Sequence, residues 1–80
     1  MTLNIFAFGI AREIMGGAAI GISLPEGSTV EQLISVLKGQ FPALSGLTSF
    51  AIAVNGKYAN IDDHISPGDE VAIIPPVSGG

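Results

Sequence analysis

The sequence has no cysteine and only one histidine among its 80 residues. Without cysteine, the chain can form neither a disulfide nor a thiolate metal site, and it has no thiol nucleophile. Three basic residues stand against seven acidic ones, and the net charge of −4 argues against nucleic acid and anionic membranes as partners. The function therefore has to come from a group other than a thiol or a basic surface.

Charged residues are also scarce. They make up 12% of the chain, about half the usual ~25%, whereas apolar residues make up 48%. A domain of this length buries only roughly 60–65% of the surface of its unfolded chain, so part of the apolar surface has to stay exposed. An exposed apolar patch usually marks a site where another protein binds.

Long apolar segments are missing as well. No run approaches the ~20 residues of a membrane span. The apolar N-terminal stretch has no basic residue before it and is interrupted by Arg12 and Glu13, which is not typical of a targeting segment. We expect one soluble, cytoplasmic domain over residues 1–76, followed by a flexible tail over residues 77–80.

The apolar pattern predicts several short strands and one main helix. Strands are predicted at residues 2–8, 19–24, 50–54, 57–59 and 71–74. Asn55-Gly56 predicts a two-residue hairpin turn between the third and fourth strands. Residues 11–15 favour one helical turn stopped by Gly16-Gly17, and residues 41–49 are predicted to be a loop.

The main helix has clear start and stop signals. Ser28-x-x-Glu31 and Thr29-x-x-Gln32 both match a capping box. Apolar residues then recur at the spacing of one helix face, and Gly39 stands where a helix commonly ends. We interpret the apolar stripe as core packing.

This order of elements predicts an α+β fold of the β-grasp, or ubiquitin-like, type. Its mixed sheet would have four to five strands, with the helix packed on one face and the last strand beside the first. In the first strand, Leu3 and Ile5 are expected to face the core, and Phe6 and Phe8 the open face. Ile74 would share that open face if the first and last strands are neighbours.

No side-chain constellation in the sequence indicates catalysis. Asp62, Asp63 and His64 lie together, but they stand beside a turn, and a solvated loop is favoured over a metal site. Arg12-Glu13 leaves two interpretations open, namely an ion pair or hydrogen bonds within the fold, or a contact with a partner. We predict no metal site.

The C-terminal residues Pro75-Pro76-Val77-Ser78-Gly79-Gly80 are the strongest functional candidates. A proline pair ends the last strand and favours an extended exit from the sheet. A terminal glycine has no Cβ, so its carboxylate can enter a narrow channel, and an activated acyl group on it cannot racemise. The alternative is a frayed, inert end.

Three segments carry a family resemblance, namely residues 68–80, residues 8–16 and residues 51–55. Together they resemble the small subunit of molybdopterin synthase, a family of ubiquitin-like sulfur carriers. The tail is the most specific of the three. The chain departs from the family pattern in residues 38–49 and at Ile73-Ile74, where the family frequently has aromatic residues.

The resemblance implies a sulfur carrier in molybdenum cofactor synthesis that has no bound cofactor of its own. An ATP-dependent enzyme would adenylylate the carboxylate of Gly80, and a sulfurtransferase would convert it to a thiocarboxylate, leaving 1-thioglycine. The carrier would dock on the large subunit of molybdopterin synthase, which supplies the catalytic residues, in an expected heterotetramer. The expected interface residues are Phe6, Phe8, Ile74 and Arg12.

Three alternatives remain open from the sequence. A sulfur carrier for the thiazole of thiamine shares the fold and the Gly-Gly end, but such carriers are usually shorter and lack Pro-Pro-Val. A ubiquitin-like modifier of lysines uses the same activation chemistry. The third alternative is an interaction domain with an inert tail.

Overall fold

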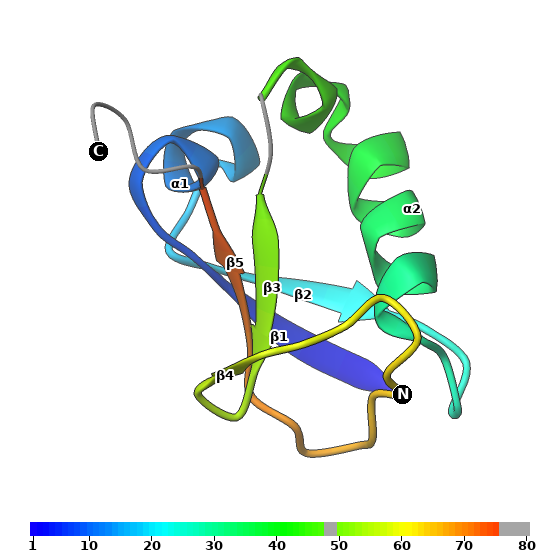
Figure 1. Cartoon of the computed structure of the whole chain (residues 1–80). Coiled ribbons are helices and arrows are strands. Elements are labelled where there is room, and N and C mark those ends of the chain that lie inside the picture. Colours follow the sequence, from blue (N-terminus) through cyan, green and yellow to red (C-terminus); the bar gives the residue numbers. More distant parts are fainter. Residues whose placement is uncertain (48–49, 76–80) are drawn as a thin grey trace.

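The computed structural model describes residues 1–47 and 50–75, which form one sheet packed against a helix (Figure 1). The strands are β1 (Thr2–Ala7), β2 (Ala19–Ser23), β3 (Ala51–Val54), β4 (Lys57–Tyr58) and β5 (Val71–Ile74). The helices are α1 (Gly9–Met15), α2 (Val30–Gln40) and the 3₁₀ helix η1 (Pro42–Gly46). None of the helices in this described part has the length and apolar character needed to span a membrane.

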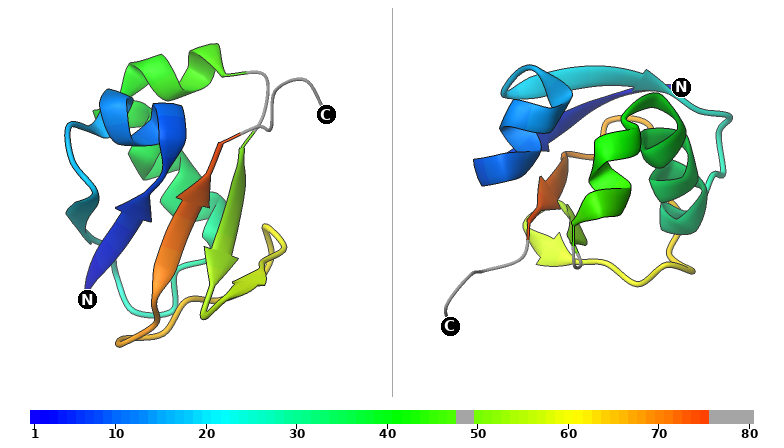
Figure 2. Two further views of the ribbon diagram at one scale, coloured as in Figure 1. Left: turned by 90° about the vertical axis from the view of Figure 1, so that its left-hand side faces the viewer. Right: turned by 90° about the horizontal axis from the view of Figure 1, so that it is seen from above.

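The strand order in the sheet is β2-β1-β5-β3-β4. The central strands β1 and β5 are parallel, and the other neighbours are antiparallel. Figure 2 shows β5 between β1 and β3, with α2 across one face of the sheet. The predicted α+β, β-grasp fold is therefore confirmed. The last strand, β5, lies in the middle of the sheet rather than at an edge.

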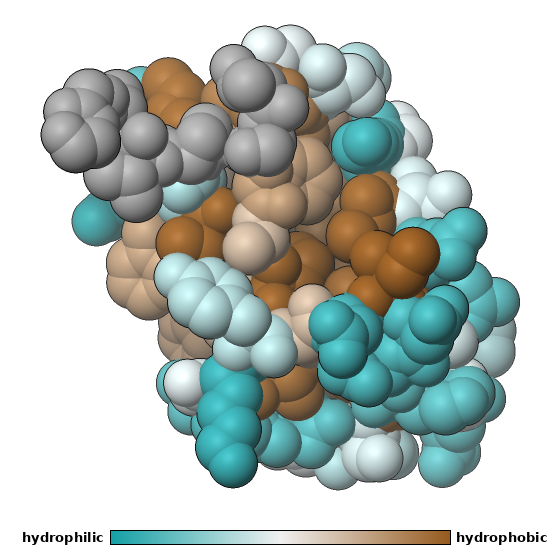
Figure 3. All heavy atoms as spheres, in the orientation of Figure 1, coloured by the Kyte–Doolittle hydropathy of each residue, from teal (hydrophilic) through white to brown (hydrophobic). Residues whose placement is uncertain are grey.

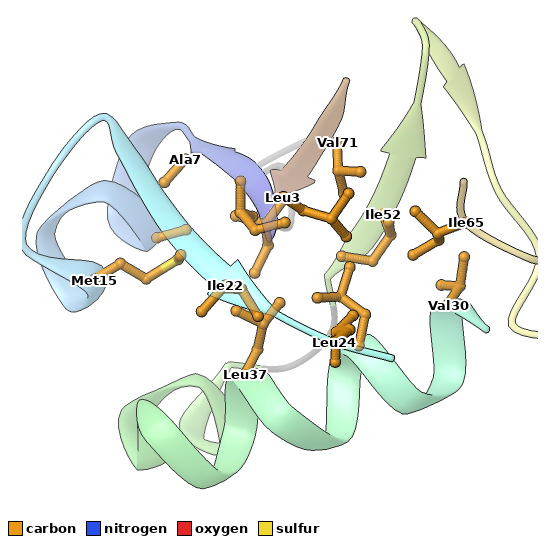
Figure 4. Close-up of a cluster of buried hydrophobic side chains, with 14 of the residues drawn as sticks. Leu3, Ala7, Met15, Ile22, Leu24, Val30, Leu37, Ile52, Ile65 and Val71 are labelled. Atoms are coloured by element: carbon orange, nitrogen blue, oxygen red, sulfur yellow. The ribbon is translucent and has the colours of Figure 1, made fainter. Parts of the chain in front are cut away.

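The core lies between this sheet and α2 (Figure 4). Leu3 and Ile5 of β1 are buried, as predicted, and so are Val71 and Ile73 of β5. Leu33 of α2 is 0% exposed. Because side chains alternate along a strand, the intervening residues of β1 and β5 point to the other face.

The start of α2 follows one of the two predicted capping boxes. The Thr29 hydroxyl accepts a hydrogen bond from the Gln32 N–H, and the Gln32 side chain accepts one from the Thr29 N–H. Ser28 instead donates its hydroxyl to the Pro25 carbonyl at 2.6 Å. The predicted end at Gly39 is wrong, because α2 continues to Gln40 and Phe41 caps it. Gly39 is exposed there and keeps a negative φ, so the helix passes through it.

Three further segments differ from the sequence prediction. The loop predicted for residues 41–49 contains η1, which begins at a proline and buries Leu44. The helix α1 is longer than one turn, because it begins at Gly9, although it ends at Gly16 as expected, with φ of 78°. Ile65, in a segment predicted to be a polar crossing, is 1% exposed and belongs to the core.

The predicted hairpin between β3 and β4 is confirmed. Asn55 and Gly56 both have positive φ, of 52° and 82°, as a type I′ turn requires. The turn places Val54 opposite Lys57 and therefore Ala53 opposite Tyr58. This register matters for the site, because it decides which side chains share the open face.

Candidate functional site: the open sheet face and the end of β5

A row of side chains crosses the open face of the sheet from strand to strand. Phe6 of β1 is paired with Ala72 of β5, Ala72 with Ala53 of β3, and Ala53 with Tyr58 of β4. Cross-strand partners of this kind point to the same face. The row therefore joins residues from four of the five strands.

The middle of this row is a shallow hollow. The residues that line it are Phe8, Ala53, Gly56, Tyr58, Glu70, Ala72 and Ile74. Alanine and glycine are much smaller than the aromatic residues around them, so they form the low part of the hollow. An apolar side chain of another protein could fill such a space. We call this hollow and its lining the open-face hollow.

The aromatic residues of the open-face hollow are strongly exposed. Tyr58 is 76% exposed and Phe8 is 53% exposed, whereas the inward-facing core residues are almost completely buried. Figure 3 looks at the molecule from the β4 side, so the open face lies along its left-hand side, where apolar atoms reach the surface above the hydrophilic atoms of the lower border. The exposed apolar patch expected from the composition is thus present, and its form suits a protein partner.

A hydrogen-bond network holds the β3–β4 hairpin against the start of β5. The Asn55 side chain donates to Asp69 Oδ1 at 3.0 Å and accepts from the Glu70 N–H at 2.9 Å. The Asp69 Oδ2 accepts from the Ser66 N–H at 2.8 Å. These bonds fix the hairpin that carries Tyr58 to one side of the open-face hollow.

The same network acts on the charge of Asp69. The Ser66 N–H, and then the Asn55 side chain, stabilise the carboxylate and lower the pKa of Asp69 below its ordinary value of 3.8. Asp69 therefore stays ionised at neutral pH, and its ionisation supports the network. Protonation of either carboxylate oxygen of Asp69 would weaken the hydrogen bond that this oxygen accepts, from Asn55 or from the Ser66 N–H.

The end of β5 lies close to the beginning of α1. A Cβ on Gly9 would stand 3.2 Å from Pro75 Cγ, and Gly9 has φ of +55°. Both observations favour glycine at this position, because a side chain would be strained and would crowd Pro75. The chain therefore leaves the sheet at a defined place, next to Phe8, the residue before Gly9. The predicted tail residues Pro76, Val77, Ser78, Gly79 and Gly80 lie outside the described residues.

The remaining predicted site residues are spread over two other places. Phe6 is half-buried and lines a separate hollow with residues of the Gly68–Glu70 turn. Arg12 is exposed on α1, where it lines a hollow with Glu13 and three glycines, apart from the open-face hollow. Phe8 and Ile74 are the two predicted interface residues that the structure brings together.

The histidine has a local role. His64 Nδ1 donates a hydrogen bond to the Gly27 carbonyl at 2.8 Å. The backbone of His64 also forms an isolated antiparallel bridge with Thr29. These contacts fix the loop beside the start of α2. Among the described residues, no group of three or more histidine, cysteine, aspartate or glutamate side chains is arranged to hold a metal ion.

Sequence reasoning missed Tyr58, the most exposed aromatic residue of the open-face hollow. A signal for it was present, because the two-residue turn at Asn55-Gly56 fixes the register of the hairpin and places Tyr58 opposite Ala53. The sequence did not show which strand lies beside β3 in the sheet. Only the pairing of β3 with β5 brings Tyr58 to the same hollow as Phe8.

Comparison with protein families gives a match over nearly the whole chain. The model of the ThiS family matches residues 5–80. A curated relative from Dictyostelium discoideum, named molybdopterin synthase sulfur carrier subunit, is 41% identical and covers 96% of this chain and 94% of its own. A relative of the same name from Arabidopsis thaliana is 34% identical, with 98% and 82% covered.

Solved structures show the same fold. The putative molybdopterin converting factor subunit 1 from Pyrococcus furiosus has a TM-score of 0.87 at 29% identity, covering 96% of this chain and 99% of its own. SAMP1 from Haloferax volcanii, a small archaeal modifier protein, has a TM-score of 0.85 at 26% identity and covers both chains fully. A further similar chain, with a TM-score of 0.70, 25% identity and full coverage, lies in the complex of subunits 1 and 2 of the molybdopterin-converting factor from Helicobacter pylori.

Proposed function

Because this chain belongs to the ThiS family, we propose that it is the sulfur carrier subunit of a molybdopterin synthase. The observation that carries the proposal is the extent of the match. Two relatives of that name are matched over 82% and 94% of their own length, and the family match runs to Gly80. The chain also lacks cysteine, which is consistent with a sulfur that is carried on the terminus rather than on a thiol side chain.

We propose that Gly80 is loaded in two balanced steps. A carboxylate oxygen of Gly80 attacks the α-phosphorus of ATP, an oxygen–phosphorus bond forms, and pyrophosphate leaves. A sulfur donor at the oxidation level of sulfide then attacks the acyl carbon and displaces AMP, which leaves a thiocarboxylate. An adenylylating enzyme and a sulfurtransferase are the expected partners for these steps, and no cofactor needs to stay bound to the carrier.

Delivery of the sulfur requires docking on the large subunit of the synthase, which is expected to supply the catalytic groups in a heterotetramer. Two features support the open-face hollow as the docking surface. It carries exposed aromatic residues, Phe8 and Tyr58, and it adjoins Pro75, where the chain leaves the sheet. A partner that binds there is held next to the origin of the tail. Phe6 and Arg12, which line two other hollows, remain predicted contacts, and a cytoplasmic location remains a prediction.

A second function is favoured by one specific observation. SAMP1 from Haloferax volcanii, which is named as a modifier protein, has the same fold at 26% identity over its full length. A modifier would use the same adenylylated terminus, but its acyl carbon would be passed to a lysine amine rather than to sulfur. The thiamine-type sulfur carrier also remains an alternative, because it shares the family's chemistry.

The length of the tail is the sharpest test of this function. Deleting Gly80 leaves Gly79 as a similar terminus that is shorter by about 3.3–3.6 Å, the reach of one residue. Reacting groups tolerate a displacement of only about 1 Å before rates fall ~100-fold. We therefore expect both the deletion and the addition of one residue after Gly80 to block thiocarboxylate or dithiolene formation. Thermal stability should be unchanged.

Intact-mass analysis after co-expression with the adenylylating enzyme separates the alternatives. Exchange of one oxygen for sulfur at the terminus supports a carrier, whereas conjugates of higher mass support a modifier. Dithiolene formation with a molybdopterin synthase large subunit distinguishes this carrier from the thiamine type. Normal sulfur transfer by either length variant would contradict the proposal, because the terminus could then not be the carrier.

A further inference from the structure

The two edges of the sheet are protected very differently. The edge strand β4 has two residues, one of which is Lys57. Short length and lysine are two of the devices by which proteins prevent an edge strand from pairing with another chain. The other edge strand, β2, has five residues with the sequence Ala-Ile-Gly-Ile-Ser. It contains no charge and no proline, and its register with β1 runs without a bulge.

The hydrogen-bond pattern shows which groups of β2 face outward. The Ala7 N–H bonds to the Ala18 carbonyl at 2.9 Å, and the Leu24 N–H bonds to the Met1 carbonyl at 2.9 Å. In an antiparallel pair every second residue exchanges both of its bonds with the neighbouring strand. The even-numbered residues of β2 therefore bond to β1, and the odd-numbered residues point their N–H and C=O groups away from the sheet.

The outward-pointing residues are Ala19, Gly21 and Ser23, all of them exposed. Each has one N–H and one C=O group, so a partner strand finds six backbone hydrogen-bonding groups in a row. Their side chains are small and do not obstruct the approach of another backbone. In Figure 2, β2 lies at the outer border of the molecule, and α2 covers the face of the sheet rather than this edge.

We infer that β2 is a self-association edge, at which two copies of this chain pair antiparallel about a two-fold axis at Gly21. The outward residues are spaced symmetrically around Gly21. The axis therefore sets Gly21 opposite its own copy and Ala19 opposite Ser23 of the copy, and every outward N–H meets a C=O. This inference does not depend on the proposed function.

The side chains of β2 suit a second copy on both faces. On the open face only small residues meet across the axis. On the core face, Ile20 is half-buried in the single chain, and it would be covered by Ile22 of the copy. Because β2 has no charged residue, no like charges are set opposite each other, although the whole chain has a net charge of −4. Pro25, two residues after the strand, limits the pairing at that end.

Pairing at β2 leaves the other functional surface accessible. The strands β5, β3 and β4, which carry most of the open-face hollow, lie on the far side of β1 from β2. Two copies joined at β2 would form one continuous sheet, with the two open-face hollows far apart. Each copy could therefore still bind its own partner.

The inference can be tested by sedimentation equilibrium together with amide hydrogen exchange at protein concentrations up to about 1 mM. We expect a monomer–dimer equilibrium, in which the exchange of the Ala19, Gly21 and Ser23 amides slows as the concentration rises. The Ile20 and Ile22 amides already bond to β1 and serve as internal references, so their exchange should change little.

Two substitutions at the symmetry axis should act in opposite directions. A Cβ added at Gly21 has no heavy atom within 4 Å, so side chains fit there in the single chain. Gly21→Lys sets two like charges opposite each other and should weaken association about threefold or more. Gly21→Val should strengthen it, because valine favours strands and pairs well across them. Gly39→Lys is the matched control, because Gly39 is exposed on α2 and also has no atom within 4 Å.

The inference is overturned if the unmodified protein stays monomeric at about 1 mM. It is also overturned if a dimer forms but exchange slows at amides other than those of Ala19, Gly21 and Ser23. A dimer that Gly21→Lys and Gly39→Lys affect equally would likewise place the interface elsewhere.

Discussion

The two faces of the sheet are built by the same strands and differ in what covers them. In β5, Val71 and Ile73 point toward α2 and are 0% exposed, whereas the alternating Ala72 and Ile74 are half-buried on the open face. The packed face is filled by aliphatic side chains from the strands and α2. The open face has small residues in its middle and exposed aromatic residues around them.

The difference separates stability from recognition along a single strand. Residues on the packed face hold the fold together, because burying their apolar surface is the main favourable term in folding. Residues on the open face contribute little to the core and are free to meet a partner. Substitutions on the two faces should therefore have separable effects, and three experiments test that separation, beginning with the largest expected effect.

The largest effect is expected on the packed face. Leu33→Ala removes a fully buried side chain of α2 and leaves a cavity, which should lower the free energy of unfolding by about 2–5 kcal/mol. Urea denaturation measures this loss. Sulfur transfer per folded molecule should be unchanged, because Leu33 does not reach the open face. Reduced transfer in protein that is fully folded would show that the two faces are coupled.

The next effect is expected on the open face. Phe8→Asp places a charge in the open-face hollow and should weaken binding to the synthase large subunit by about 2 kcal/mol or more, the scale of an interface hot spot. Stability should change little, because the Phe8 side chain is 53% exposed. Isothermal titration with the large subunit, together with thermal denaturation, measures both quantities.

Ile61→Asp is the matched control for Phe8→Asp. Ile61 is also 53% exposed, but it lies beside the start of α2, where its carbonyl accepts the Glu31 N–H at 3.0 Å. The control should bind the large subunit like the unmodified protein. If Phe8→Asp unfolds the domain, Phe8 supports the core and the separation of the two faces is wrong. Equal binding by both variants would remove Phe8 from the docking surface.

The smallest effect concerns the link between the open-face hairpin and β5. The pKa of Asp69 is lowered in the folded chain, so its carboxylate stabilises the fold at pH values above the ordinary value of 3.8. This stabilisation should be lost as the pH falls from there through the lower pKa of the folded state. In Asp69→Asn that part of the acid dependence of the urea midpoint should be absent.

Asp62→Asn serves as the control for this pH profile, because Asp62 is an exposed carboxylate that takes no part in the hydrogen bonds among Asn55, Ser66, Asp69 and Glu70. Above pH 3.8, Asp69→Asn should have the lower midpoint, and the gap to the unmodified protein should close in acid. A gap that stays constant with pH would show that the charge of Asp69 does not support the network.

Much of the fold could be predicted because its local signals agree. Leu3 and Ile5 are buried and Phe8 is exposed, as expected from the strand predicted at residues 2–8, although β1 ends at Ala7 and Phe8 caps α1; the Asn55-Gly56 pair predicts the hairpin turn. The errors fall where packing overrides a local signal. Gly39 is a common helix-ending residue, but α2 continues for one more residue to Gln40 before Phe41 caps it.

Ile65 illustrates a second kind of error. Its neighbours in sequence are polar, so the segment was predicted to be solvated, yet the Ile65 N–H bonds to the Ser28 carbonyl at 2.8 Å and its side chain is 1% exposed. A single apolar residue carries no periodic signal. Only the position of the start of α2, far away in the chain, decides that Ile65 enters the core.

The sequence by itself predicts where the chemistry lies. Without cysteine and with one histidine, the chain has few reactive side chains, and its Gly-Gly terminus is the strongest candidate for carrying a group. Alternation along each strand also divides its side chains into two sets, but which set faces the core is an expectation that the burial of Leu3 and Ile5 confirms. What only the tertiary structure decided is which outward residues meet. Tyr58 joins Phe8 in one hollow because β3 pairs with β5, and β2 remains a bare edge because no other described segment pairs with its outer side. Both results depend on hydrogen bonding between segments far apart in the chain, which no local pattern encodes.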